Sequence, residues 1–358
     1  MPMAITDLDD LRRHLQWAIT VEHATIPPYQ CAMLSVVDQE SEAFLTFKYV
    51  VREEMLHLAL AANLLAWLGG TPRFAGPDVM PAYPGPMPHH DPDPPLILHL
   101  ERASVEVVGD VFLRIEQPEL RGSRPQSDRY DTLGQFYDAI ADGIERLGTD
   151  VAGPAKQVTR SYMGHGGGTL FAVVNHETAM RAIREIIEQG EGSSQTDFEP
   201  YGFEGASEPS HYHRFRAIVD GHVPIGEVHP MRRDPSTDAL APGPVRDLSA
   251  LFDGCYSLQL LVMERAWREG DASALIDDAM VPLMNHAQKP IARALLGQEI
   301  DADTGDHAGP AFGWRPTPIG EMVASARELG ERYDLGPTLA TLEQVSPLVD
   351  LEGIDPVG

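Results

Sequence analysis

The sequence predicts an all-α protein: a four-helix bundle with long connecting loops and additional C-terminal helices. Through most of the 358 residues, apolar side chains recur at spacings of three and four, which is the period of an amphipathic helix. The sequence lacks a series of segments with the alternating apolar and polar residues that predict β-strands, and it has no internal repeat of the length found in solenoid proteins. Helices packed on helices are therefore the expected architecture.

Two long helices are expected at the N-terminus. The first covers 7–35, with Thr6 or Asp7 as its N-cap, and Pro27 and Pro28 should break or kink it late. The second covers 41–68 and ends at a pair of glycines. Because the connection between them is short, the two helices should be antiparallel neighbours.

Proline and glycine separate shorter helices in the rest of the chain. The stretch 71–93 is too rich in proline for regular structure. Further helices are expected over 104–116, 132–147, 175–189, 207–219, 247–270, 273–296 and 317–345. We expect residues 1–222 to form the bundle, with inserted Pro/Gly-rich loops at 71–131 and 148–168, and residues 223–358 to form a C-terminal helical extension packed on it.

Composition argues against several classes of partner. The chain has 54 acidic residues against 27 Lys plus Arg, and its formal charge of −27 repels nucleic-acid phosphates and anionic lipid. The two cysteines, Cys31 and Cys255, are too few for a disulfide framework. No signal peptide is recognisable, and the most apolar stretch, 56–68, is short for a membrane span. We therefore expect a cytoplasmic protein that binds neither nucleic acid nor membrane.

The two N-terminal helices place acids on faces that should be buried. In the first helix, Glu22 falls on the stripe of Leu15 and Ala18, which faces the core. In the second helix, Glu54 and His57 lie one turn apart within a continuous apolar seam. Both positions are costly for an ionised carboxylate.

Two later segments repeat this anomaly. Glu208 and His211 form a second Glu-x-x-His pair that continues into an apolar stripe. Between the two pairs, the helix over 175–189 places Glu191 four residues beyond the inward-facing Ile187, whereas Glu188 follows two arginines on a face that looks solvated. Glu191 is modestly preferred, and Glu188 stays open as the alternative.

Burying these carboxylates alone would cost several kcal/mol or more, unless cations or shared protons compensate. Ferritin-like di-iron and di-manganese bundles take one Glu from each of two helices and a Glu-x-x-His pair from each of two others. The chain offers this inventory in Glu22, Glu54, His57, Glu188 or Glu191, Glu208 and His211. The sequence therefore predicts a ferritin-like bundle that binds two Fe ions, with Mn as the alternative.

Simpler interpretations exist for individual residues. A lone Glu-x-x-His is common by chance, and Glu22 could instead pair with Arg52. His23, Tyr29 and Tyr212 flank proposed ligands and are either partners of those ligands or ordinary packing residues. Four large side chains are expected to lie in the packing interface of the C-terminal helix pair: Met263, Trp267, Met280 and Met284. The alternative is that they line a substrate pocket.

Five segments of the chain resemble a known family. They are 15–27 (LQWAITVEHATIP), 52–57 (REEMLH), 132–137 (TLGQFY), 188–192 (EQGEG) and 210–215 (SHYHRF). In this order they are similar to the ferritin-like domain of the iminophenylpyruvate dimer synthases of bisindole pigment biosynthesis and of their stand-alone bacterial relatives. The resemblance implies a carboxylate-bridged di-metal bundle tied to natural-product oxidation. The resemblance does not identify the substrate of this chain, because the pigment enzymes have an additional large region.

The expected function is a non-haem di-iron oxidase or oxygenase that activates O₂ on a small organic substrate. No flavin or nicotinamide fingerprint is visible in the sequence, so an electron-donor protein or a reducing substrate is expected as a partner. The long amphipathic helices make a homodimer reasonable. The alternatives are a ferroxidase or iron-storage protein with the same site, and a non-catalytic pathway scaffold.

Overall fold

The structure is a computed structural model of the whole chain. It describes residues 5–89, 94–117, 130, 132–148, 156–161, 168–190, 209–270 and 274–349. Within these ranges the α-helices are α1 Leu8–Ser35, α2 Glu42–Trp67, α3 Val105–Val107, α4 Leu113–Ile115, α5 Leu133–Leu147, α6 His176–Gly190, α7 His211–Val219, α8 Pro244–Glu269, α9 Lys289–Leu296, α10 Ile319–Tyr333 and α11 Gly336–Val345.

Short elements join these helices. The π-helical segments are η1 Val108–Phe112, η4 Ile276–Met280 and η5 Leu283–Gln288, and the 3₁₀ turns are η3 Thr237–Ala239 and η6 Ser346–Leu348. Three two-stranded antiparallel ribbons pair β1 Gly85–Pro86 with β2 Ile97–Leu98, β3 Arg160–Ser161 with β4 Thr169–Leu170, and β5 Glu299–Asp301 with β6 Asp306–His307. The predicted all-α class is confirmed, because these ribbons only link helices.

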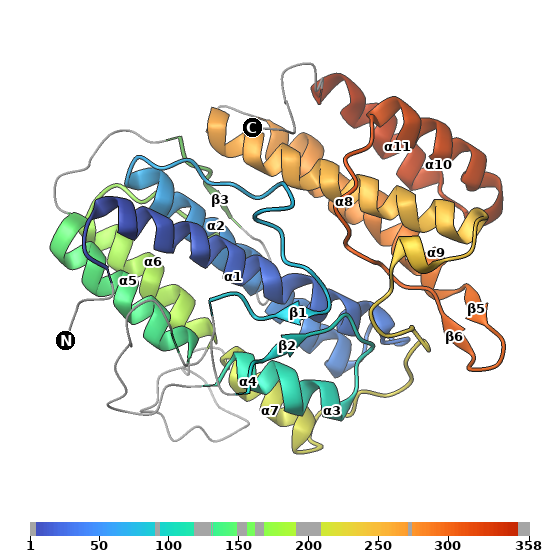
Figure 1. Cartoon of the computed structure of the whole chain (residues 1–358), viewed down its shortest axis with the longest axis horizontal. Coiled ribbons are helices and arrows are strands. Elements are labelled where there is room, and N and C mark those ends of the chain that lie inside the picture. Colours follow the sequence, from blue (N-terminus) through green and yellow to red (C-terminus); the bar gives the residue numbers. More distant parts are fainter. Residues whose placement is uncertain are drawn as a thin grey trace.

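The helices α1 and α2 form the centre of the molecule (Figure 1). Each begins at a side-chain cap, since Asp7 accepts a hydrogen bond from the N–H of Asp10 and Ser41 accepts one from Phe44. Near the start of α1, Arg12 Nε donates to the carbonyl oxygen of Leu68 at the end of α2, at 2.8 Å. The two helices are therefore antiparallel, as their short connection predicts.

Of the break or kink expected at Pro27 and Pro28, the break does not occur, because α1 continues to Ser35. Proline lacks an N–H, so Pro28 leaves the carbonyl oxygen of Ala24 without its helical donor. The hydroxyl of Tyr83 donates to this oxygen at 2.8 Å. Tyr83, in the Pro-rich segment after α2, thus satisfies a backbone group that the proline would otherwise leave unpaired.

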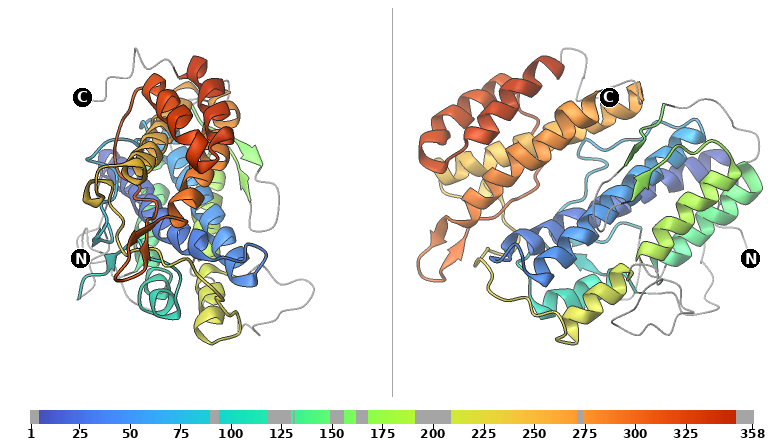
Figure 2. Two further views of the ribbon diagram at one scale, coloured as in Figure 1. Left: turned by 90° about the vertical axis from the view of Figure 1, so that its right-hand side faces the viewer. Right: turned by 180° about the vertical axis from the view of Figure 1, so that it is seen from behind.

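The other helices cover different sides of the central pair (Figures 1 and 2). The pair α5 and α6 packs on one side, α8 to α11 lie on another, and α7 packs against η1 near α2. Helix α5 turns Phe136, Ile140 and Ile144 inward. It approaches α1 closely at Gly143, where a Cβ atom would lie 3.0 Å from a methyl group of Leu11. The polar cluster described below lies within this packed frame.

Two C-terminal predictions need correction. The single helical segment expected over 317–345 is two helices, separated at Asp334, whose φ of 51° is left-handed. The helix expected over 273–296 contains the π-helical segments η4 and η5 before α9.

Helix α7 begins at His211, while the expected start at 207 lies outside the described residues. No helix among the described residues is long and apolar enough to cross a membrane.

Candidate metal centre

Two overlapping groups of buried side chains could each hold a metal ion. One consists of Glu22, Glu54 and His57, and the other consists of Glu54, Glu116 and His211. In each group the ligand atoms all lie within 4.8 Å of one another. Glu54 belongs to both groups, so its carboxylate could be shared between two ions.

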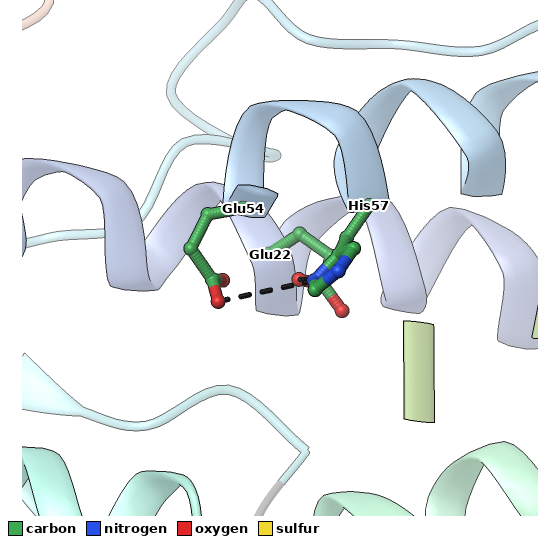
Figure 3. A group of neighbouring side chains, drawn as sticks. All are labelled: Glu22, Glu54 and His57. Atoms are coloured by element: carbon green, nitrogen blue, oxygen red, sulfur yellow. Dashed lines mark ion pairs between the residues drawn. The ribbon is translucent and has the colours of Figure 1, made fainter. Parts of the chain in front are cut away.

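The first group comes from the central helix pair. Figure 3 shows Glu22 reaching from α1 toward Glu54 and His57 on α2. His57 Nδ1 lies 3.6 Å from Glu22 Oε2 and 3.9 Å from Glu54 Oε1. All three side chains are buried because they lie on the faces that α1 and α2 turn toward each other and toward the bundle. The apolar seam of each helix therefore places these groups together.

The second group adds residues from two other segments. Glu116 follows α4, at the end of the helical stretch that runs through η1, and His211 is the first residue of α7. His211 Nδ1 lies 2.8 Å from Glu54 Oε1 and 3.5 Å from Glu116 Oε2. The π-helical turn of η1 lies one helical turn before Glu116, and such turns occur frequently at functional sites.

The two histidines are held in the same way. His57 Nε2 lies 2.8 Å from Gln189 Oε1 of α6, and His211 Nε2 lies 2.9 Å from Glu53 Oε2. These oxygens accept a hydrogen bond from the Nε2–H of each histidine, so Nδ1 is the nitrogen that faces the carboxylates and is available to a metal ion. The close approach of His211 Nδ1 to Glu54 lacks hydrogen-bond geometry, so this buried nitrogen has no hydrogen-bond partner. An unpartnered imidazole nitrogen among carboxylates fits a metal ligand.

Hydroxyl groups orient the carboxylates. Tyr137 donates to Glu22 Oε1 in a short hydrogen bond, and Tyr29 donates to Glu116 Oε1 at 2.7 Å. Thr25 donates to Glu54 Oε2 at 2.5 Å. Each of these three carboxylates thus has a hydroxyl donor on one oxygen. Such contacts fix the orientation of a ligating carboxylate.

Burial and mutual repulsion perturb the ionisation of the cluster. Burial, reinforced by Glu116 and Glu22, raises the pKa of Glu54 to about 7. Burial opposes protonation of His211, but the carboxylates of Glu116, Glu53 and Glu54 outweigh it and raise its pKa well above the usual value. The pKa of His57 is also raised, because the carboxylate of Glu22 outweighs burial. The metal-free cluster therefore holds extra protons that cations would displace.

The chemistry of the donor set fits two divalent ions. Three carboxylates and two imidazoles supply oxygen and nitrogen donors, and the described residues bring no thiolate to the cluster. Mixed oxygen and imidazole ligation suits iron and manganese, whereas zinc in structural sites favours Cys and His. The shared carboxylate would allow two ions to bind side by side.

The structure brings four of the proposed ligands together: Glu22, Glu54, His57 and His211. Glu188, the open alternative, is exposed on α6 and belongs to neither group, while Ile186 and Gly190 of the same helix face inward. The preferred Glu191 and the proposed ligand Glu208 lie outside the described residues. Metal binding by these side chains stays a prediction.

Sequence reasoning missed Glu116, although the signal was present. Val108, Phe112 and Glu116 are spaced by four, and all three are buried. This is again a carboxylate on an apolar stripe, but in a short helix within the segment expected to be an inserted loop. The contributions of Glu53 and Gln189 behind the histidines were also missed.

The three neighbours differ in position. Tyr29 hydrogen-bonds to Glu116 and is a partner of the cluster. His23 points elsewhere and pairs with Tyr256 at 2.5 Å. Tyr212 is half-buried beside His213, on a different face of α7 from His211.

Comparisons with known proteins agree with this geometry. The sequence model of the family described as Ferritin-like matches residues 15–220. The chain is also similar to the solved structure of a ferritin-like protein from Caulobacter vibrioides, with a TM-score of 0.65 and 24% identity over 86% of this chain and 99% of that chain. A likeness at this identity concerns the fold alone. Comparison with curated protein sequences gave no match.

Proposed function

The chain belongs to the ferritin-like family, and on that premise we propose that it is a non-haem di-iron oxidase or oxygenase acting on a small organic substrate. The observation that carries the proposal is the position of Glu54 between two candidate metal groups. Glu22 and His57 would complete one ion's protein ligands, and Glu116 and His211 would complete those of the other. Iron bound there supplies redox chemistry with O₂, and manganese is the alternative.

The chain's own residues would hold and insulate this centre. Gln189 and Glu53 keep the Nδ1 atoms of the two histidines free for metal. Tyr137 and Tyr29 hold their protons on hydroxyls directed at Glu22 and Glu116, since burial raises the pKa of both phenols well above the usual value. The carboxylates thereby stay oriented without losing their negative charge.

A small cavity adjoins the cluster. It has a volume of about 20 Å³ and is lined by cluster residues together with apolar side chains of α5 and α6, including Leu133, Ile186 and Ile187. This volume is enough for one molecule of the size of water. The apolar side chains in its lining suit a small apolar molecule such as O₂, which supports a role in O₂ chemistry.

The second candidate is a ferroxidase, in which iron itself is the substrate. The small size of this cavity among the described residues favours it, because ferrous ion and O₂ need no larger space. The organic oxidase remains our first proposal, because the chain has a long C-terminal part, α8 to α11, beyond the family match. The resemblance to the iminophenylpyruvate dimer synthases leads us to propose natural-product metabolism, with electrons from a separate reductase or from the substrate.

Anaerobic loading followed by O₂ tests the proposal. Metal-free protein would be loaded with ferrous iron under argon, mixed with O₂, and followed by O₂ consumption and optical absorption. We expect rapid consumption that is absent in Glu116→Ala and retained in Glu188→Gln, which removes an exposed acid. Repeated iron turnover without any organic co-substrate would favour the ferroxidase, and no consumption in the loaded wild-type protein would contradict both functions.

A further inference from the structure

Two adjoining cavities lie on a different face of the central helices from the metal cluster. The apolar cavity has a volume of about 240 Å³, and the basic cavity has a volume of about 120 Å³. They share Gln30, Arg52, Met55, Met284, Asn285 and Gln288 as lining residues. They therefore share one wall between the central pair and the segment that contains η5, and we call the two cavities together the pocket.

Helical register separates this pocket from the cluster. On α1, Glu22 faces the cluster, whereas His23 lines the apolar cavity. On α2, Glu54 faces the cluster, whereas Arg52 and Met55 line the pocket. Consecutive residues of a helix point about 100° apart, so a ligand in the pocket would not contact the cluster.

The walls of the apolar cavity are adaptable. Met55, Met263, Met280 and Trp267 line it. Methionine is unbranched and polarizable, and it adjusts to ligands of different shape. The opposite wall comes from η4 and η5, and π-helical turns of this kind are frequent at functional sites. The side chains expected to pack the C-terminal helix pair, with a pocket wall as the alternative, thus line a cavity.

Two pairs of polar side chains in the apolar cavity satisfy each other. His23 pairs with Tyr256 at 2.5 Å, and Gln288 donates to Gln259 at 2.5 Å. These pairs present neutral groups to the cavity. The apolar cavity therefore suits the uncharged part of a ligand.

The basic cavity concentrates positive charge in a chain of net charge −27. Lys48, Arg52 and Lys289 line it, all half-buried. Within the described residues, none of these side chains forms a hydrogen bond or salt bridge, and no aspartate or glutamate lines either cavity. Burial, together with Arg293 and the other two cations, lowers the pKa of Lys289, which shows how closely the charges are grouped. Cations without carboxylate partners favour an anionic ligand.

We propose that the two cavities form a binding site for an organic monocarboxylate with an apolar body. Its carboxylate would lie among Lys48, Arg52 and Lys289, and its body would extend past Met55 into the apolar cavity. Arg52 is suited to the carboxylate, because a guanidinium offers two parallel N–H donors. This site is separate from the proposed di-iron function and does not depend on bound metal.

Isothermal titration calorimetry on the full metal-free chain tests the proposal. The probes are decanoate, 4-phenylbutyrate and the neutral 1-decanol, so that aliphatic and aromatic acids are distinguished and charge is varied at constant chain length. We expect one molecule of at least one acid to bind per chain, and decanol to bind at least about tenfold more weakly than decanoate.

Variants assign the binding to this pocket. Arg52→Gln should weaken acid binding by about tenfold or more, and Met284→Trp, which fills the shared part of the pocket, should abolish it. Arg327→Gln removes an exposed arginine paired with Glu343 and should change nothing. Circular dichroism and metal content should match the wild type in all three variants. Equal affinity for decanoate and decanol, unchanged binding in Arg52→Gln and Met284→Trp, or no binding of either acid would overturn the proposal.

Discussion

Glu54, one of the proposed metal-ligating residues, should destabilise the folded protein when no metal is bound. Burial and the neighbouring carboxylates raise the pKa of Glu54 from 4.5 to about 7. A tenfold change in proton affinity is worth about 1.4 kcal/mol, so the ionised Glu54 costs the folded state about 3 kcal/mol. Replacing it with neutral glutamine removes this cost, and the amide oxygen can still accept the hydrogen bond from Thr25.

The size of the effect depends on pH. Because the pKa of Glu54 is raised in the folded state, its carboxyl group is protonated without penalty well below the unfolded value of 4.5. The penalty grows as pH rises from there to about 7, and then stays constant. Glu54→Gln should therefore increase the free energy of unfolding by about 1 kcal/mol at about pH 5.5 and by about 3 kcal/mol at about pH 8.

Urea denaturation in the presence of a chelator measures this difference. Glu188→Gln is the matched control, because it neutralises an exposed acid and should change stability by less than about 0.5 kcal/mol. Saturating ferrous or manganous ion should reverse the order, since bound metal stabilises only the protein that retains the shared ligand. A metal-free Glu54→Gln protein no more stable than the wild type at about pH 8 would refute this reasoning.

Three further outcomes follow from the same contacts. Metal affinity should fall as pH decreases below about 7, because protons compete at Glu54 and His211, whose pKa values are raised. Calorimetry with manganous ion over this pH range measures the affinity. An affinity that does not change with pH would count against the cluster as the ligand set. Tyr29→Phe removes the donor to Glu116 and should weaken metal binding about tenfold or more at unchanged fold; affinity equal to the wild type would show that this hydroxyl orients nothing. Asn63→Leu removes the hydrogen bonds that Asn63 donates to the carbonyl oxygens of Val158 and Phe171 and the one that it accepts from the indole N–H of Trp267. The free energy of unfolding, measured by urea titration, should fall by about 2 to 4 kcal/mol. A loss under about 1 kcal/mol would mean that this buried network contributes little.

The part of the site that could be predicted lies on the long helices. In α1 and α2 the apolar period extends over many turns, so a carboxylate that interrupts the seam is recognisable at Glu22 and Glu54. His211 was recognisable for the same reason on α7. These positions depend only on which face of a helix is buried, and periodicity determines that face.

The rest depended on tertiary packing. Acids were sought on the longer helices, whereas Glu116, at the end of a short helical stretch, joins Glu54 and His211 in the cluster. The local sequence pattern does not determine whether the segment before Glu116 or α6 places an acid in the cluster. The roles of Gln189 and Glu53 likewise arise from contacts across 132 and 158 residues of sequence. The division of the chain near residue 222 stays a prediction.

Metal stoichiometry is the most direct test of the dinuclear site. Protein produced without an affinity tag in iron-supplemented medium would be analysed by plasma mass spectrometry beside Glu54→Ala and Glu188→Gln. The shared position of Glu54 predicts about two iron or manganese ions per chain in the wild type and in Glu188→Gln, and loss of both in Glu54→Ala. No metal in the wild type after anaerobic reconstitution, or equal metal in Glu54→Ala, would contradict the account.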